Sequence, residues 1–460
     1  MPRRRFIPCA ATLGLLLSGA ASASAQIGVS LNRAGSGARA AGMGDAFIAV
    51  SDDGTAASWN PAGLAQLRQP EFSLVYVVSD RGIRFSGMRS PDDRVAYSTR
   101  RYGFTNSSID FASAAVPFSV ARKPITLQIG WHRLYQLGAE LSGNFDRRLL
   151  SEPSAPPAFV SLDDRVVGNI DVVSVAGSVK LTARTAVGGS LDLWRGGWTE
   201  RASLVEEAGG QGSSAFLTRN SRQDLRGHNF TVGALLTYPS WNAGLVYHAP
   251  FWSSFHIKGD VHSSNTSGGS FDAPGARFRL PRSIGAGVSR RFAARWAAAV
   301  AVTHDQWTDG LLDVPGERNV VNFFDGLPPE LTTTRDTVAL NLGVEHLFLR
   351  EGSVVPLRLG FGWEPQGAMD PVTRDPVDFL LLSGGGGYNT NRFKFDAAVQ
   401  YRWGGFRISD VLSAGTALAG GLARDALGRA TTHEWRVKVS AIYRMPDSDT
   451  LRSVLKKIFG

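Results

Sequence analysis

Few side chains in this sequence are placed where they could carry out enzymatic chemistry. The eight histidines are scattered, with no His-Glu-x-x-His motif and no pair at the spacing of metal ligands. No Gly-x-Ser-x-Gly nucleophile motif is present, and the single cysteine, Cys9, lies upstream of an N-terminal apolar run. We therefore expect no catalytic site, no metal and no cofactor, and predict that the protein is not an enzyme.

Three other stretches have residue types that occur in binding sites. Residues 370–378, "DPVTRDPVD", depart from an EF-hand loop, so a solvated hairpin tip is the alternative to a loop calcium site. In "VVNFFDGL" (320–327), Phe323 and Phe324 are candidates for an apolar capture site in an outer loop, the alternative being packing within the loop. The glycines of "LSGGGG" (382–387) suit a bulge or the close approach of another segment.

Composition sets the class of protein. The chain has 460 residues, and 43% of them are hydrophobic, which is ordinary for a folded protein. The net charge of +9 falls to +6 without Arg3, Arg4 and Arg5, and the remaining basic residues are scattered along the chain. A scattered excess indicates a solvated surface, so we expect no nucleic-acid partner.

Residues 1–25 are predicted to be a secretory signal peptide. Three arginines precede the apolar run "AATLGLLLSGAA", and "ASA" (23–25) supplies small residues for cleavage before Gln26. The apolar run is shorter than the roughly 20 residues of a transmembrane helix. Because Cys9 falls within this segment, the exported chain is expected to contain no thiol and no disulfide.

Strict alternation of apolar and polar residues recurs along the chain and predicts β-strands. In "RFKFDAAVQYRW" (392–403), apolar or aromatic residues alternate with Lys, Asp, Gln and Arg. Aromatic residues bracket many of these apolar sets, as expected for girdles at the two interfaces of a membrane. The charges on the opposite face are too many for a dry core and suit a wet lumen, which favours a membrane barrel over a soluble sandwich.

The pattern predicts an all-β fold, a transmembrane antiparallel β-barrel of about 14 strands over residues 71–445. The strands centre on Leu74, Phe111, Ile129, Val175, Leu191, Val232, Leu245, Ile284, Val300, Leu340, Leu359, Leu381, Ala397 and Val439. Connections after even-numbered strands are short, whereas those after odd-numbered strands, such as 142–165 and 309–335, are long and polar. This alternation is typical of outer-membrane barrels, with short turns and both termini in the periplasm. Only a closed barrel pairs every strand edge in lipid.

Residues 26–70, in front of the first strand, do not alternate. They are rich in Gly and Ala, carry a few apolar residues such as Phe47 and Leu64, and contain the turn signal Asn60-Pro61. A compact irregular segment before a barrel fits inside the lumen as a plug. The apolar positions and Trp59 favour this interpretation over a flexible periplasmic leader.

The phrase "GARAAGMGDAFIAVSDDGTAASWNPAGLA", followed by fourteen strands, resembles the FadL family of outer-membrane long-chain fatty-acid and hydrocarbon transporters (FadL-like, TodX type). Further similarity lies in "SSIDFASAAVPF", "LPRSIGAGVSRRFAARWAAAVAVTHDQW" and "VPLRLGFGWEPQGAMDP", and it covers nearly the whole predicted mature chain. Accessory barrels of a protein secretion system share the same N-terminal phrase, which in this family forms a hatch.

The resemblance implies uptake of hydrophobic molecules, either long-chain fatty acids or hydrocarbons, by passive diffusion across a Gram-negative type of outer membrane. In the family, outer loops catch a substrate, which enters an apolar pocket and leaves sideways through a gap in the barrel wall. The hatch blocks straight-through flow. The expected partners are hydrophobic small molecules, outer-membrane lipid and lipopolysaccharide. The alternative function is that of an accessory barrel in protein secretion.

The resemblance also assigns expected site residues. The Asn-Pro-Ala of the hatch matches Asn60, Pro61 and Ala62, which would form the turn that seats it. Supporting contacts are expected from Gly42, Gly44, Asp45 and Phe47. The alternative is that these residues only fold the plug.

Two further expectations concern the wall and the C-terminus. A kinked third strand places the lateral gap in the family, and here Gly130 or Gly138 of "ITLQIGWHRLYQLGAEL" would supply a bulge.

Residues 446–460 depart from the family pattern because the last strand normally ends the chain. Their helical spacing of apolar residues is consistent with a periplasmic tail that binds a partner, or with a loosely packed terminus.

Overall fold

The computed structural model describes residues 32–89, 95–120, 122–151, 154, 158–207, 215–264, 268–317, 319–369, 374, 376–408 and 427–446. The predicted signal peptide with Cys9 therefore lies outside the described residues, as does nearly all of the predicted tail. Most of residues 370–378, the candidate calcium loop, lie outside them too.

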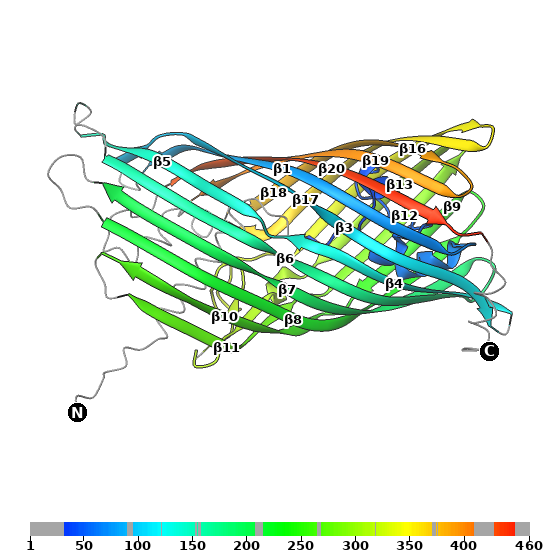
Figure 1. The fold of residues 1–460 in the computed structure, drawn as a ribbon, viewed down its shortest axis with the longest axis horizontal. Helices are drawn as coiled ribbons and strands as arrows, with labels where there is room; N and C mark the ends of the chain where they lie inside the picture. Colours follow the sequence, from blue (N-terminus) through cyan, green and yellow to red (C-terminus); the bar gives the residue numbers. More distant parts are fainter. Residues whose placement is uncertain are drawn as a thin grey trace.

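Fourteen antiparallel strands close into a barrel, as predicted (Figure 1). Closure is completed where β1 pairs with both β20 and β3. Each predicted strand centre falls in a different strand of this ring. In order around the wall, the strands are β1 (Glu71–Arg89), β3 (Arg100–Val120), β4 (Lys123–Gln136), β6 (Ala158–Lys180), β7 (Thr185–Glu207), β8 (Ala215–Thr237), β9 (Trp241–His248), β12 (Ser283–Phe292), β13 (Trp296–Asp305), β16 (Thr337–Arg350), β17 (Ser353–Met369), β18 (Pro376–Asn389), β19 (Phe393–Ile408) and β20 (Leu427–Arg444).

Six additional strands extend the wall at its long-loop end. They are β2 (Val95–Tyr97), β5 (Ala139–Leu149), β10 (Phe251–Ser263), β11 (Gly269–Leu280), β14 (Leu311–Asp313) and β15 (Val321–Asn322). The stretches predicted as long polar connections, residues 142–165 and 309–335, therefore contain strand segments. The inner faces of β10 and β11 carry buried apolar residues such as Phe255 and Phe278, so these strands continue the wall within stretches predicted as long connections.

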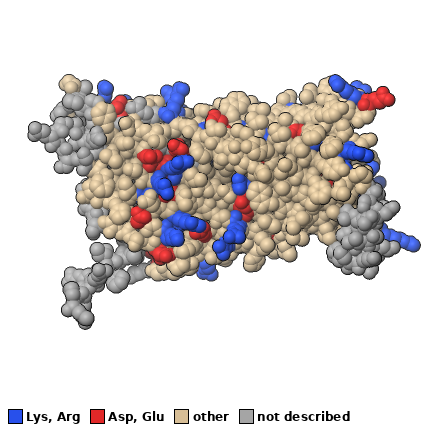
Figure 2. Space-filling view, in the orientation of Figure 1, with Lys and Arg blue, Asp and Glu red and all other residues tan. Residues whose placement is uncertain are grey.

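The faces of the strands are arranged as in a membrane barrel. Leu191, Leu359 and Ile129 point outward and are 68%, 66% and 58% exposed, whereas the inward-facing Gln400 and Arg358 are buried. On the face of the wall seen in Figure 2, charged side chains of both signs gather in the left half and at the right-hand, short-turn end, and few lie between these two groups. An apolar band of this kind is what a barrel presents to lipid.

Residues 32–70 lie inside the barrel toward the short-turn end, where Figure 1 shows them in dark blue. They contain one short α-helix, α2 (Ala38–Gly42), and two 3₁₀ helices, η1 (Ala56–Ser58) and η2 (Pro61–Gln66). A third 3₁₀ helix, η3 (Trp307–Asp309), lies in an outer connection. Among the described residues no helix has the length and apolar character needed to cross a membrane.

Candidate functional site

Asn60 lies at a contact between the N-terminal segment (residues 32–70) and the wall. Its Nδ2 donates hydrogen bonds to the carbonyl oxygens of Ile48 (3.2 Å) and of Ala234 on β8 (3.1 Å). Its Oδ1 accepts one from the N–H of Ala62 (3.1 Å), which caps η2. Pro61 takes the first position of that helix, where a missing N–H forfeits no helical hydrogen bond. This turn ties the segment to the barrel.

Gly44 forms a second contact with the wall. Its N–H donates to Ser383 Oγ (2.9 Å), and its carbonyl oxygen accepts from Asn341 Nδ2 (2.7 Å). Its φ of 62° is in the left-handed region, which glycine adopts without strain. A Cβ at this position would lie 2.6 Å from the amide nitrogen of Phe361 on β17. Only glycine fits between the segment and this strand.

The other predicted hatch residues flank these two contacts. The carbonyl oxygen of Gly42 accepts from Ser383 Oγ (3.3 Å), and Phe47 is buried edge-on against Trp59 with ring centroids 6.0 Å apart. Asp45 accepts a hydrogen bond from Gln400 Nε2 (3.1 Å). Burial raises the pKa of Asp45, although the nearby cations of β20 partly counter this effect.

Arg39 of α2 joins the segment to a buried chain of charges. It pairs with Asp52 inside the segment and with Glu345 of β16 (3.1 Å). Glu345 also pairs with Arg358 (2.7 Å), which in turn pairs with Asp396 (2.7 Å). Burial disfavours the charged form of Arg39, but the two carboxylates outweigh this effect and raise its pKa further. The segment is therefore anchored by ion pairs as well as by backbone contacts.

The wall is interrupted between β3 and β4. Phe111 and His132 form the last residue pair between these strands, and beyond them residues 100–109 of β3 pair only with β1 in the part of the chain that the structure describes. Asp110 bulges from the β1–β3 ladder at this point, since Val75 pairs with Phe111 and the next residue of β1 pairs with Ile109. We call this unpaired stretch the β3–β4 break.

The two glycines predicted to mark the lateral gap take different places. Gly130 pairs with Ser113 inside the paired part of β3 and β4. Gly138 lies at the break, between β4 and β5. Its carbonyl oxygen accepts a hydrogen bond from Arg81 Nη1 (3.3 Å). A Cβ at this position would lie 2.5 Å from the Phe104 ring. Of the two glycines, only Gly138 is therefore at the edge of the break.

An interior cavity of about 190 Å³ reaches this break. Its lining includes Arg33 and Trp59 from the N-terminal segment, Asp110 at the break, and Gly130 and His132 from the adjoining paired part of β4. On the lipid-facing side of the same strands lies an apolar groove of about 650 Å³. Gly130 lines both the cavity and the groove, so the wall is thin there.

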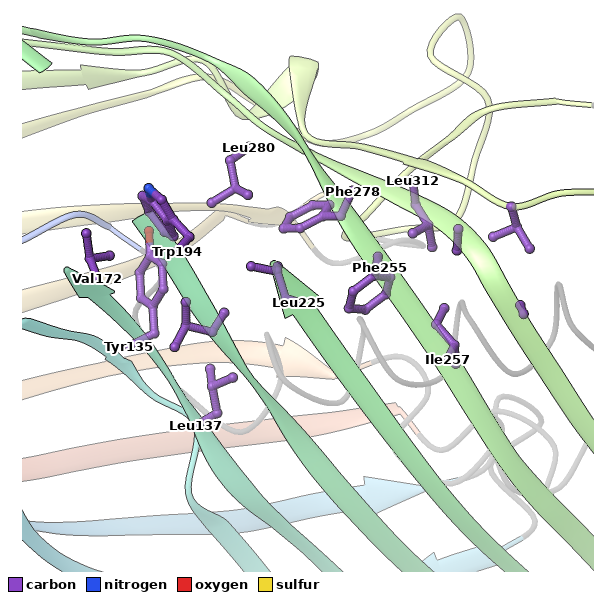
Figure 3. Packing of buried hydrophobic residues seen from close by; sticks show 14 residues of the cluster. Tyr135, Leu137, Val172, Trp194, Leu225, Phe255, Ile257, Phe278, Leu280 and Leu312 are labelled. Atoms are coloured by element: carbon purple, nitrogen blue, oxygen red, sulfur yellow. The ribbon is translucent and has the colours of Figure 1, made fainter. Parts of the chain in front are cut away.

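An apolar cluster continues the cavity toward the long-loop end (Figure 3). Trp194 and Tyr135 belong both to the cavity lining and to this cluster. At its outer edge Phe323 packs on Phe278 with ring centroids 4.5 Å apart. The neighbouring Phe324 is buried against Trp307. Of the two predicted capture residues, Phe323 thus touches the apolar cluster, whereas Phe324 packs with Trp307 of its own loop and with Ala368 of β17.

The inner-wall glycines are site residues that the sequence analysis did not identify as such. A Cβ on Gly360 would overlap the backbone of Gly44, and one on Gly233 would overlap the side chain of Asn60. Gly385, in the run predicted to allow close approach, would place a Cβ 3.2 Å from the Cα of Gly42. Small residues at inward positions of otherwise alternating strands are the signal that could have identified them.

No protein-family model and no curated protein sequence matches this chain. Its fold, however, is found in solved structures. They include a FadL homologue of Pseudomonas aeruginosa (16% identity, 91% of this chain and 99% of that chain covered, TM-score 0.60). The toluene transporter TodX of P. putida (14%, 90% and 99%, 0.58) and the toluene transporter TbuX of Ralstonia pickettii (14%, 90% and 99%, 0.52) are also similar. The resemblance seen in the sequence is thus confirmed at the level of the fold.

Proposed function

We propose that this barrel carries hydrophobic small molecules across the outer membrane of a Gram-negative type of cell. One observation carries the proposal: a cavity in the barrel interior lies between an apolar cluster and the β3–β4 break. Solved barrels of this fold include toluene transporters, which agrees with such a substrate.

The proposed route follows the apolar surface. A molecule would meet the cluster near Phe323, pass along Phe278 and Trp194 into the cavity, and leave through the β3–β4 break into lipid. Keeping apolar surface from water stabilises it by about 25 cal/mol per Å². A sheltered path with a sideways exit therefore needs no energy input, because the molecule diffuses toward the acyl layer in which it dissolves.

In this proposal the N-terminal segment acts as a hatch. The turn at Asn60, Pro61 and Ala62 seats it on β8, and Gly44 seats it against β17. With the segment held in the lumen, straight passage to the short-turn side is blocked, and the break is left as the exit. The short turns and both chain ends would then face the periplasm.

The direct test is uptake of radiolabelled toluene and oleate by cells that lack their own transporter for hydrophobic compounds. Cells expressing the chain should take up at least one of the compounds, and the paired change Asn60→Ala and Pro61→Ala should lower uptake because it removes the seat of the hatch. Equal insertion of both barrels is checked by gel shift. An inserted barrel that takes up neither compound would refute the proposal and favour the secretion-accessory alternative, for which co-purification with large partner proteins is the test.

A further inference from the structure

A row of polar side chains crosses the inner wall of the cavity on five neighbouring strands. Thr231 of β8 is paired with His248 of β9, which is paired with Ser283 of β12. Ser283 is paired in turn with Asp305 of β13, and Asp305 with Thr337 of β16. Directly paired residues on one face of a sheet have neighbouring side chains. The first four residues of this polar row line the cavity.

Several polar atoms here are buried without a hydrogen-bond partner. Ser283 is 1% exposed and Asp305 is 3% exposed, yet Ser283 Oγ and Asp305 Oδ2 have no hydrogen-bond partner of good geometry among the described residues. Nη2 of Arg33, which enters the same cavity from the N-terminal segment, is likewise buried and has no such partner in the described part of the chain. Buried polar atoms nearly always have a partner, so this donor and these acceptors mark a place where a bound molecule can supply one.

Aromatic rings form the adjoining wall. The Arg33 guanidinium lies over the ring of Trp194, 4.9 Å from its centroid, and Tyr135 packs against the same tryptophan (Figure 3). Phe111 contributes a further ring to the lining. An apolar cavity of about 150 Å³ holds a benzene molecule, so a cavity of about 190 Å³ fits a single substituted ring rather than a long acyl chain.

We propose that the cavity binds a small aromatic alcohol or phenol, with its ring beside Trp194 and its hydroxyl between Arg33 and Asp305. This inference rests on the proposed function and names the substrate class of the same site. The hydroxyl donates to Asp305 Oδ2 and accepts from Arg33 Nη2, and Ser283 Oγ can complete the set. A hydroxyl is the simplest group that is both donor and acceptor.

The charges at the site favour a neutral hydroxyl over the two other common substituents. A carboxylate would gain from Arg33 but would be repelled by Asp305, so the site as a whole presents no excess positive charge to it. A plain hydrocarbon such as toluene would leave the buried donor and acceptors unbonded. Sites built to hydrogen-bond a hydroxyl reject the analogue that lacks it.

The polar row holds the residue types of a hydrolytic triad but not their arrangement. His248 Nδ1 lies 3.0 Å from Thr231 Oγ1, and Ser283 Oγ makes no hydrogen bond to the imidazole. Asp305 neighbours the serine rather than the histidine. A nucleophilic serine needs a hydrogen bond to its base, and the base needs an orienting partner on its other nitrogen. The row is therefore suited to binding.

The test compares three ligands that share a methyl-substituted ring, namely 4-methylphenol, toluene and 4-methylbenzoate. Their dissociation constants are measured by calorimetry on the purified full-length barrel, after its folding has been checked by gel shift. The native protein should bind 4-methylphenol roughly 10-fold or more tightly than toluene, the equivalent of one added hydrogen bond. Asp305→Asn should remove most of this preference and strengthen 4-methylbenzoate binding, because the repelling charge is gone.

The matched control is Asp272→Asn, the same chemical change at an exposed aspartate paired with His256 outside the cavity, and it should leave all three constants unchanged. Equal binding of toluene and 4-methylphenol would overturn the inference while leaving the proposed function standing. Binding of none of the three ligands would overturn the inference and count against the proposed function. Oleate uptake by the same barrel would then support the proposed function without the inference. A preference for 4-methylphenol that survives Asp305→Asn would also overturn the inference.

Discussion

Asp110 accepts a charged hydrogen bond from Lys438 Nζ (3.3 Å) on β20 and a second bond from Ser36 Oγ of the N-terminal segment. The same residue bulges from β3 beside the last β3–β4 pair. One buried carboxylate therefore contacts the segment and β20, two strands away around the wall, and lies at the edge of the break. Movement of the segment and the width of the break are expected to be coupled through it.

Gly360→Ala should loosen the N-terminal segment without preventing barrel formation. The new methyl group would overlap the backbone at Gly44, and overpacking of this kind costs about 1–3 kcal/mol. The free energy of local opening is measured as protease protection of the segment across a urea series. Gly384→Ala is the matched control, since its Cβ would meet Leu359 at 3.7 Å and the carbonyl oxygen of Arg358 at 3.8 Å, both ordinary van der Waals contacts. Equal protection of both variants would show that the close fit at β17 is unimportant.

Asn60→Ala should increase ion leakage through the barrel. The change removes both side-chain hydrogen bonds to carbonyl groups and the cap of η2, and loss of a cap alone costs about 0.5–2 kcal/mol. A less firmly seated segment leaves the lumen open for part of the time. Single-channel conductance in planar bilayers reports this directly, with Asn220→Ala on an outer part of β8 as the control. If the Asn60→Ala barrel conducts like the native one, the other contacts of the N-terminal segment are sufficient to keep it in the lumen.

Arg39 and Glu345 should be energetically coupled. The two side chains are mostly buried and joined at 3.1 Å, and neighbours in one ion-pair network typically show coupling of 0.5–3 kcal/mol. A double-mutant cycle with Arg39→Met and Glu345→Gln, scored by the same protease protection, should give a coupling free energy of about 1 kcal/mol or more. If the free-energy effects of the two substitutions simply add, the Arg39–Glu345 ion pair does not help to hold the N-terminal segment in the lumen.

Periodicity was enough to predict the barrel, because lipid on one side and a polar lumen on the other impose alternation on every spanning strand. Leu191 and Leu359 were placed correctly as strand centres for this reason. The outer strands β10 and β11 were missed. Phe255 and Ile257 of β10, like Phe278 and Leu280 of β11, do alternate with polar residues and face the apolar cluster, but they lie in a stretch that was predicted as one long polar connection.

The candidate site was only partly accessible from the sequence. Asn60 and Pro61 could be singled out because a turn signal is local in the chain. The polar row could not, because Ser283 and Asp305 become neighbours only through the register of β12 and β13. The kink was predicted in the third strand, β4, whereas the bulge beside the break is at Asp110 of β3, an ordinary residue in an alternating stretch, which bulges only in the context of β1.

The central claim is that a hydrophobic molecule leaves through the β3–β4 break, and closing the break by a cross-link tests it most directly. Ser108 and Gln136 face each other across it, with a side-chain hydrogen bond of 3.2 Å. A short bis-maleimide joined to Ser108→Cys and Gln136→Cys should abolish most uptake of the compound that the native barrel carries. The same linker on Asp80→Cys and Thr105→Cys, which joins strands that are already paired, should leave it unchanged. Undiminished uptake through the barrel linked between residues 108 and 136 would contradict the account.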